Sequence, residues 1–269
     1  MVTVLEVAMI AGAAGAATGL GALPVFATNR FSHRSYDTAV GLAAGVMIGA
    51  AVFALIVPGL EYGTLTEVVA GMTIGAVFLL LVNRTLPHAH VFFDGLINGD
   101  STENEERAYP ESRGIEPLDD DTRRAALIGG SITIHNVPEG LAVGIAFASG
   151  LDAVGIALAI AIAVQNVPDG FAMAVPASRA GLSNIKTTVL TTLSGALPEP
   201  IAAVVGFTLV TLVTGLFPIA AGFAAGAMMA VVFREMIPLS HGHGYADEST
   251  LAFVVGFGVM VVVDVGLAV

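Results

Sequence analysis

The stretch SITIHNVPEGLAVGIAFASGLDAVGIALAIAIAVQNVPDGFAMAV, residues 131–175, decides the fold of this chain. It is long and apolar enough to cross a bilayer twice, since one crossing helix needs roughly 20 mostly apolar residues. The motif HNVPEG at 135–140 returns as QNVPDG at 165–170, a spacing of 165 − 135 = 30 residues. Each crossing therefore carries an imidazole or amide, a second amide, a proline and a carboxylate in one register.

The composition of the whole chain indicates the same class of protein. Hydrophobic residues make up 55% of the 269 residues, charged residues only 12%, and the mean hydropathy is +0.85. These values predict an all-α polytopic membrane protein with a single transmembrane domain over 1–269. The absence of cysteine excludes disulfides and thiolate ligands. Eight segments are long and apolar enough to cross, with the first retained as its own insertion signal: 3–27, 38–58, 66–86, 123–149, 152–176, 187–213, 218–239 and 249–268.

The ten basic residues predict the orientation of these segments. All of them fall in or beside the connections that follow the first, third, fifth and seventh segments, whereas the turns at 59–65, 150–151 and 214–217 contain no Lys or Arg. Basic connections stay in the cytoplasm, so both termini are predicted to be extracellular in a multi-pass protein of the cell membrane.

One connection, at about 87–122, is much longer than the others. Between Val91 and Asp121 it holds ten acidic residues against two Arg, and it contributes most of the net charge of −12. Such a composition predicts a solvated, disordered cytoplasmic loop.

The repeated motif predicts a cation site between the fourth and fifth segments. On a helix, His135 shares a face with Glu139, and Gln165 shares one with Asp169, with Asn136 and Asn166 slightly to one side. The prolines predict kinked helices in which backbone carbonyls are freed at membrane depth. A carboxylate there costs roughly 2.5–3.5 kcal/mol unless it is compensated. A kink alone, or hydrogen bonding between helices, explains either motif by itself, but the coincidence of both favours an ion pathway.

Other polar residues extend this prediction along the chain. Glu199 lies near the middle of the sixth segment, between Pro198 and Pro200. Glu235, beside Arg234, lies near the inner end of the seventh segment and either pairs there or lines an exit. Short histidine pairs on the predicted cytoplasmic side could hold a departing metal weakly: His88 with His90, and His241 with His243.

With these motifs, the chain resembles the ZIP (ZRT/IRT-like) family of divalent metal transporters, in its GufA-like bacterial and archaeal branch. The resemblance spans essentially the whole length and rests on HNVPEG and QNVPDG, with support from Pro198-Glu199-Pro200, Glu235-Met-Ile-Pro238 and Leu86-Pro-His88. It implies a dimer of eight-helix subunits, in which helices one, four, five and six form a metal-carrying bundle that moves against the other four.

The resemblance also implies a binuclear metal site. One metal would be held by His135, Glu139, Gln165 and Asp169, and a neighbouring metal by Asn136, Asn166 and Glu199, with Glu139 and Asp169 bridging. Asp169 is one methylene shorter than the usual Glu of this branch, and Asn166 is neutral where some members have Asp. Three carboxylates neutralise one divalent ion fully but not two, so we expect one transport site rather than a fully occupied pair.

The predicted function is therefore transport of a divalent transition metal, with the metal as substrate and no catalytic cofactor. Zinc is expected first, although imidazole, carboxylate and amide ligands also admit Cd²⁺, Mn²⁺, Fe²⁺ or Co²⁺. The family implies uptake by alternating access, and repulsion among the emptied carboxylates suggests a proton-linked return. The alternatives are a proton- or sodium-coupled carrier of a small organic solute and an intramembrane metallohydrolase. The chain lacks the His-Glu-x-x-His motif and the second intramembrane His that a metallohydrolase would need, so we expect no enzyme. We also expect no nucleic acid partner.

Overall fold

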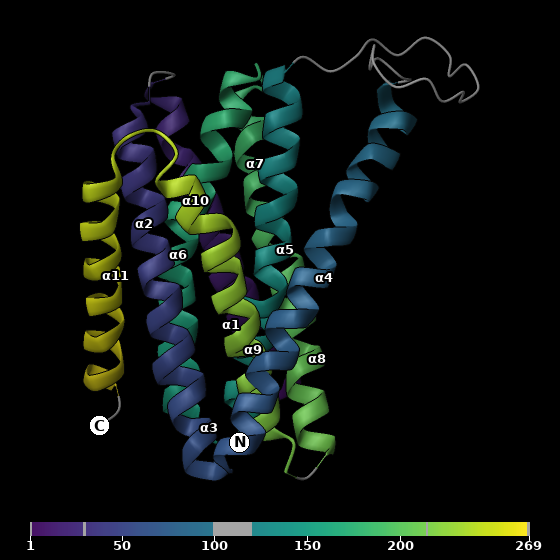
Figure 1. Cartoon of the computed structure of the whole chain (residues 1–269), viewed down its shortest axis with the longest axis vertical. Coiled ribbons are helices and arrows are strands. Elements are labelled where there is room, and N and C mark those ends of the chain that lie inside the picture. Colours follow the sequence, from purple (N-terminus) through teal and green to yellow (C-terminus); the bar gives the residue numbers. More distant parts are fainter. Residues whose placement is uncertain (1, 29–30, 99–119, 214, 268–269) are drawn as a thin grey trace.

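The computed structural model describes residues 2–28, 31–98, 120–213 and 215–267, with the backbone alone at 85–98, 120–129, 131, 132 and 267. Within these ranges the chain is all helical and crosses the bundle eight times (Figure 1). The first four crossings are α1 (Val4–Ala16) with η1 (Ala17–Phe26), α2 (His33–Ala50) with η2 (Ala51–Ile56) and α3 (Val57–Tyr62), α4 (Leu65–Asn98), and α5 (Asp120–Ala148). The last four are α6 (Asp152–Arg179), α7 (Asn184–Ala196) with α8 (Pro198–Leu212), α9 (Phe217–Val231) with η3 (Val232–Met236) and α10 (Ile237–Ser240), and α11 (Ala246–Leu267).

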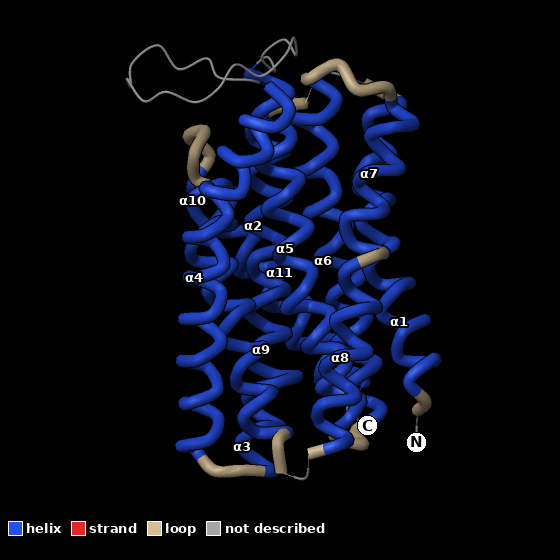
Figure 2. Tube along the Cα trace, turned by 90° about the vertical axis from the view of Figure 1, so that its right-hand side faces the viewer, coloured by secondary structure: helices blue, strands red, loops and turns tan. Residues whose placement is uncertain are grey.

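The eight crossings confirm the predicted membrane fold. Seven of them are long and apolar enough to span a bilayer by length and composition, and α5, whose first half is described by its backbone alone, is the eighth. The first and last described residues lie at the same end of the bundle (Figures 1 and 2), as an even number of crossings requires.

Two helices extend into the long connection between the third and fourth crossings. α4 continues to Asn98 and α5 begins at Asp120, so both ends of the connection expected at 87–122 are helical. The rest of that connection, 99–119, lies outside the described residues, and its disorder stays a prediction.

The helices have irregular turns at positions that the sequence did not single out. α5 and α6 are continuous α-helices through Pro138 and Pro168, and the kinks expected there stay a prediction. Short π-helices occur in the second and seventh crossings, directly before the turns that hold Pro58 and Pro238. Proline has no amide hydrogen, so the wider π turn accommodates the missing hydrogen bond.

The sixth crossing, expected as one helix over 187–213, is divided in two. α7 ends at Ala196, and α8 begins at Pro198 with Glu199 in its first turn. Two prolines in three residues cannot donate to the preceding turn, so the helix restarts there. The carboxylate of Glu199 lies at a helix N-terminus, where the helix dipole favours negative charge.

Glycine allows the helices to pack closely, which matters in a bilayer because no hydrophobic driving force brings helices together there. A Cβ at Gly75 of α4 would overlap the backbone of Phe223 in α9, and one at Gly170 of α6 would overlap the carbonyl oxygen of Thr18 in η1. The most extensive contacts join α4 to α9, α11 to α2, α5 to α8, and α6 to η1 and α5. The motif-bearing helices α5 and α6 thus lie in a group with the first and sixth crossings.

Candidate metal centre

The seven site residues predicted from the sequence are all withdrawn from solvent. His135, Asn136, Glu139, Gln165, Asn166, Asp169 and Glu199 are each at most 6% exposed. They come from the middle of α5, the middle of α6 and the first turn of α8. Burial of three carboxylates in an apolar bundle is costly unless hydrogen bonds or cations compensate their charge.

Hydrogen bonds join the two motifs to each other and to the sixth crossing. The Gln165 amide donates to Glu139 Oε1 at 2.6 Å, which connects α6 to α5. The Asn166 amide donates to Glu199 Oε1 at 2.8 Å and to the carbonyl of Ala14 at 2.9 Å. Each of these amides therefore stabilises the negative charge of a carboxylate that belongs to a different helix.

Asn136 is oriented by a backbone group that the helix break sets free. Its amide donates to the carbonyl oxygen of Ser194 at 2.7 Å. In a regular helix this carbonyl would accept from the residue four positions later, but that residue is Pro198, which has no N–H. The side chain of Asn136 supplies the missing donor, and its own oxygen is directed away from the bond.

The same anchoring leaves a set of buried oxygen atoms without partners. Five of these atoms, all acceptors, have no hydrogen bond within the described part of the chain: Asn136 Oδ1, Glu139 Oε2, Gln165 Oε1, Asn166 Oδ1 and Glu199 Oε2. A buried acceptor left unpaired costs about 1–3 kcal/mol. Amide and carboxylate oxygens can instead coordinate a divalent cation, which would satisfy several of them together.

The nature of the donors limits what this centre can bind. No three His, Cys, Asp or Glu side chains of the described residues lie close enough to hold a metal by themselves, so amide oxygens are needed to complete a coordination shell. The charges of Glu139, Asp169 and Glu199 are nevertheless close enough to interact electrostatically. The arrangement therefore fits a cation that accepts oxygen ligands of both kinds.

His135 contacts Glu235, a residue that the sequence predicted for the exit path rather than for the metal centre. Its Nε2 forms a hydrogen bond with Glu235 in η3, whose other carboxylate oxygen accepts from the Asn83 amide of α4. His135 also remains within electrostatic range of Asp169. The expected exit residue Glu235 thus contacts an expected metal ligand directly, and joins the fourth crossing to the third and seventh.

Sequence reasoning did not single out Asn83. The signal was weak but visible, because Asn83 is the first amide after the apolar run Gly75–Val82. An amide at the end of such a run needs a partner, and Glu235 provides one.

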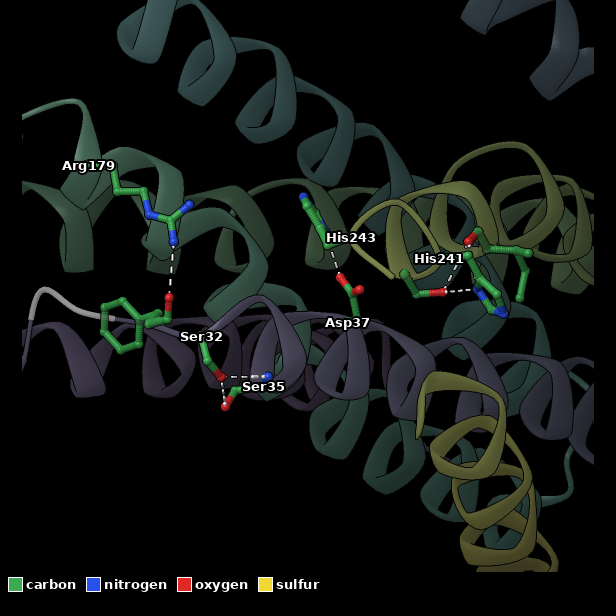
Figure 3. Close-up of polar contacts among 9 residues, drawn as sticks. Ser32, Ser35, Asp37, Arg179, His241 and His243 are labelled. Carbon is green, nitrogen blue, oxygen red and sulfur yellow. Dashed lines mark hydrogen bonds and ion pairs between the residues drawn. The ribbon is translucent and has the colours of Figure 1, made fainter. Parts of the chain in front are cut away.

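The remaining predicted exit residues do not form one group. His241 bonds through Nδ1 to Ser240 Oγ at 2.9 Å and through Nε2 to Thr250 Oγ1 at 3.3 Å. His243 instead forms a hydrogen bond with Asp37 of α2 (Figure 3). His88 and His90 lie in the part of α4 whose side chains are outside the described residues.

Known proteins resemble this chain over almost its full length. The family model described as "ZIP Zinc transporter" matches residues 98–264. The zinc transporter GufA of Myxococcus xanthus is 33% identical over 263 residues, which cover 94% of this chain and 96% of the relative. The zinc transporter ZIPB of Bordetella bronchiseptica is 35% identical over 97% of this chain and 81% of its own, and human zinc transporter ZIP11 is 32% identical over 93% and 94%. The chain therefore belongs to the ZIP family, in its GufA-like branch, and with it to the membrane transporters rather than the enzymes.

Proposed function

We propose that this protein carries Zn²⁺ into the cytoplasm through the centre built by α5, α6 and the first turn of α8. The observation that carries the proposal is the set of five buried oxygen atoms without protein partners, contributed by both motifs and by Glu199. Membership of the ZIP family and the zinc transporters among its relatives support a divalent metal as the substrate. The oxygen-rich donor set also admits Cd²⁺, Mn²⁺, Fe²⁺ and Co²⁺.

The proposed ligands are His135, Asn136, Glu139, Gln165, Asn166, Asp169 and Glu199. The charge of the three carboxylates is sufficient for one divalent ion. Asn166 is neutral and shares its amide with Glu199 at 2.8 Å, which favours one occupied site over two. When the ion leaves, the three carboxylates lose their counter-charge, and a proton can replace part of it. Proton linkage is therefore part of the proposal.

Alternating access would move a first group of helices, made of the first, fourth, fifth and sixth crossings, past a second group made of the other four. The His135 to Glu235 hydrogen bond joins α5 of the first group to η3 of the second, so movement between the groups would break it. A metal at His135 would compete for the same nitrogen. We infer that binding of the metal and release of Glu235 are linked, with Glu235 beginning the exit path.

Uptake into proteoliposomes tests the function directly. Chelator-sensitive entry of Zn²⁺ or Cd²⁺ is measured for the intact protein and for Glu139→Ala and Asp169→Ala. We expect both substitutions to reduce entry to the level of empty liposomes, because each removes a buried carboxylate of the centre. Glu61→Ala is the matched control, since Glu61 is an exposed carboxylate near the end of α3.

Two outcomes would contradict the proposal. Folded, correctly inserted protein without metal entry would show that the centre only binds, and would return attention to an organic solute as the substrate. Unchanged entry in both variants would place the transported ion elsewhere. Entry that is indifferent to a pH gradient would remove proton linkage but leave metal transport intact.

The orientation and assembly are proposed on the same basis. We infer a homodimer in the cell membrane with both termini outside, from the distribution of basic residues and from the family. The chain has no cysteine, so single cysteines report sidedness without background. Asp152→Cys, at the first residue of α6, should react with an impermeant maleimide outside, whereas Asp247→Cys, near the start of α11, should react only after permeabilisation. The reverse pattern would invert the orientation, and a monomer in crosslinking would refute the dimer.

A further inference from the structure

A second polar group lies apart from the metal centre, where α2 begins and α10 connects to α11. Asp37, in the first turns of α2, is fully buried. Its Oδ1 accepts from His243 Nδ1 at 2.7 Å (Figure 3), and its Oδ2 is buried with no hydrogen bond to any described residue. Burial of a carboxylate with one unpartnered oxygen costs free energy, and a contact that only holds a helix against a turn does not account for that cost.

The bond to Asp37 fixes the chemistry of the His243 ring. A carboxylate accepts, so Nδ1 carries the hydrogen, and in the neutral imidazole Nε2 then keeps its lone pair. Metal-binding histidines are held by the same arrangement, in which the second nitrogen donates to a carboxylate that orients the ring and raises its basicity. The His243 side chain is 22% exposed, and no hydrogen bond occupies its Nε2 within the described residues. His243 is therefore oriented as a ligand with an available nitrogen.

A second imidazole lies directly against the first. The His33 ring stacks on His243 with the centroids 4.3 Å apart and the planes inclined by 21°. Two nitrogens that share a tetrahedral Zn²⁺ lie about 3.3 Å apart, given Zn–N bonds of about 2.0–2.1 Å. His33 is exposed at the first residue of α2, so a rotation of its side chain can bring a nitrogen beside that of His243.

The surrounding charges do not oppose a cation here. Arg34, the neighbouring cation, forms an ion pair with Glu248 at 3.3 Å, which compensates its charge. The negative charge of Asp37 has no Lys or Arg partner among the described residues. On the other side, the Tyr36 ring meets His243 edge-on at 5.8 Å and limits movement of the imidazole.

The geometry points to a divalent-cation site formed by His243 and His33, with Asp37 as a positioning residue, at the end of the bundle where α2 begins. It would take Zn²⁺ or another divalent ion that favours imidazole, with water completing the shell. The site is separate from the proposed transport centre and does not depend on it, because none of its residues belongs to α5, α6 or α8.

Equilibrium dialysis against Zn²⁺ tests this site in the purified full-length protein. The background variant Glu139→Ala/Asp169→Ala lacks two ligands of the transport centre, so its remaining Zn²⁺ reports other sites. We expect one equivalent to remain bound, and we expect His33→Ala and His243→Ala each to weaken its binding at least tenfold. Asp37→Asn should weaken it about 10–100-fold, the usual effect of removing a carboxylate behind a metal-bound histidine. Ser35→Ala, an exposed change in the same helical turn, should leave binding unchanged.

The outcomes separate this site from a structural clamp and from the transport centre. Unaltered binding in His33→Ala, or no Zn²⁺ on the background variant, would overturn the proposal and leave Asp37 and His243 as a link between α2 and the α10–α11 turn. His33 is exposed, so its variant decides the question even if His243→Ala fails to fold. As a second measurement, Zn²⁺ should protect His33 and His243 from carbethoxylation by diethylpyrocarbonate. Equal Zn²⁺ on the intact and background proteins would count against the transport centre alone.

Discussion

Replacement of Asn166 by aspartate separates the structural and ligand roles of this side chain. Asn166 donates two hydrogen bonds, to Glu199 Oε1 at 2.8 Å and to the Ala14 carbonyl at 2.9 Å. An ionised aspartate has the same shape but no donor, so both acceptors lose their partner in a buried position. At about 1–3 kcal/mol for each orphaned acceptor, Asn166→Asp should destabilise the metal-free protein by about 2–6 kcal/mol at neutral pH.

Zn²⁺ should offset this loss of stability in Asn166→Asp. The substitution adds a fourth carboxylate to the centre, and a divalent cation can bridge it to Glu199 where the amide hydrogen bond was lost. We therefore expect Zn²⁺ to stabilise Asn166→Asp more than the original protein. Acidification without metal should also recover part of the loss, because a protonated carboxyl regains one donor. Asn166→Leu is the control, since it loses the same two hydrogen bonds but gains no ligand.

Thermal unfolding in detergent, with chelator or with excess Zn²⁺, measures both effects. At roughly 2–4 °C for each kcal/mol in a chain of this size, the metal-free variant should unfold at least about 4 °C lower. The reasoning is refuted if Asn166→Asp is as stable as the original protein under chelator. It is equally refuted if Zn²⁺ shifts Asn166→Asp no further than it shifts Asn166→Leu.

Two further substitutions test packing and the link to the seventh crossing. Gly170→Ala should destabilise by about 1–3 kcal/mol, because its Cβ would overlap the Thr18 carbonyl; Gly258→Ala, where a Cβ meets nothing within 4 Å, should be neutral in the same thermal unfolding assay. Asn83→Leu removes the amide that donates to Glu235 Oε1. We expect the free energy of unfolding to fall by about 1–3 kcal/mol and the rate of Zn²⁺ entry to change. Unchanged values of both would show that Asn83 contributes neither to stability nor to transport.

The sequence alone predicts the crossings well, and for a physical reason. Hydrocarbon requires long apolar helices, so length and hydropathy are sufficient to find them, and the even number of crossings places both ends of the chain together. The burial of the two motifs was also predictable, because Glu139 and Asp169 lie within those apolar runs.

The contacts of the centre could not be predicted in the same way. A helix that is apolar on nearly every side gives no signal of how it is rotated toward its neighbours, so the bonds of Gln165 to Glu139 and of His135 to Glu235 are visible only in the structure. Positions of helix irregularity were equally hidden. Prolines occur in both continuous and interrupted helices here, as Pro138 and Pro58 show, so the presence of a proline alone does not indicate which outcome follows.

The division of the sixth crossing has a consequence for the rigidity of the group of helices that holds the centre. The carbonyl of Ser194 has a side chain of α5 as its donor in place of the amide that Pro198 lacks. The secondary structure of one helix is thus completed by a residue that is also a candidate metal ligand on another. Any sliding of α5 along α7 must therefore leave a backbone carbonyl unsatisfied or turn the Asn136 oxygen away from the centre. The two helices are coupled mechanically at that point, and a substitution such as Pro198→Ala, which restores the amide, would uncouple them.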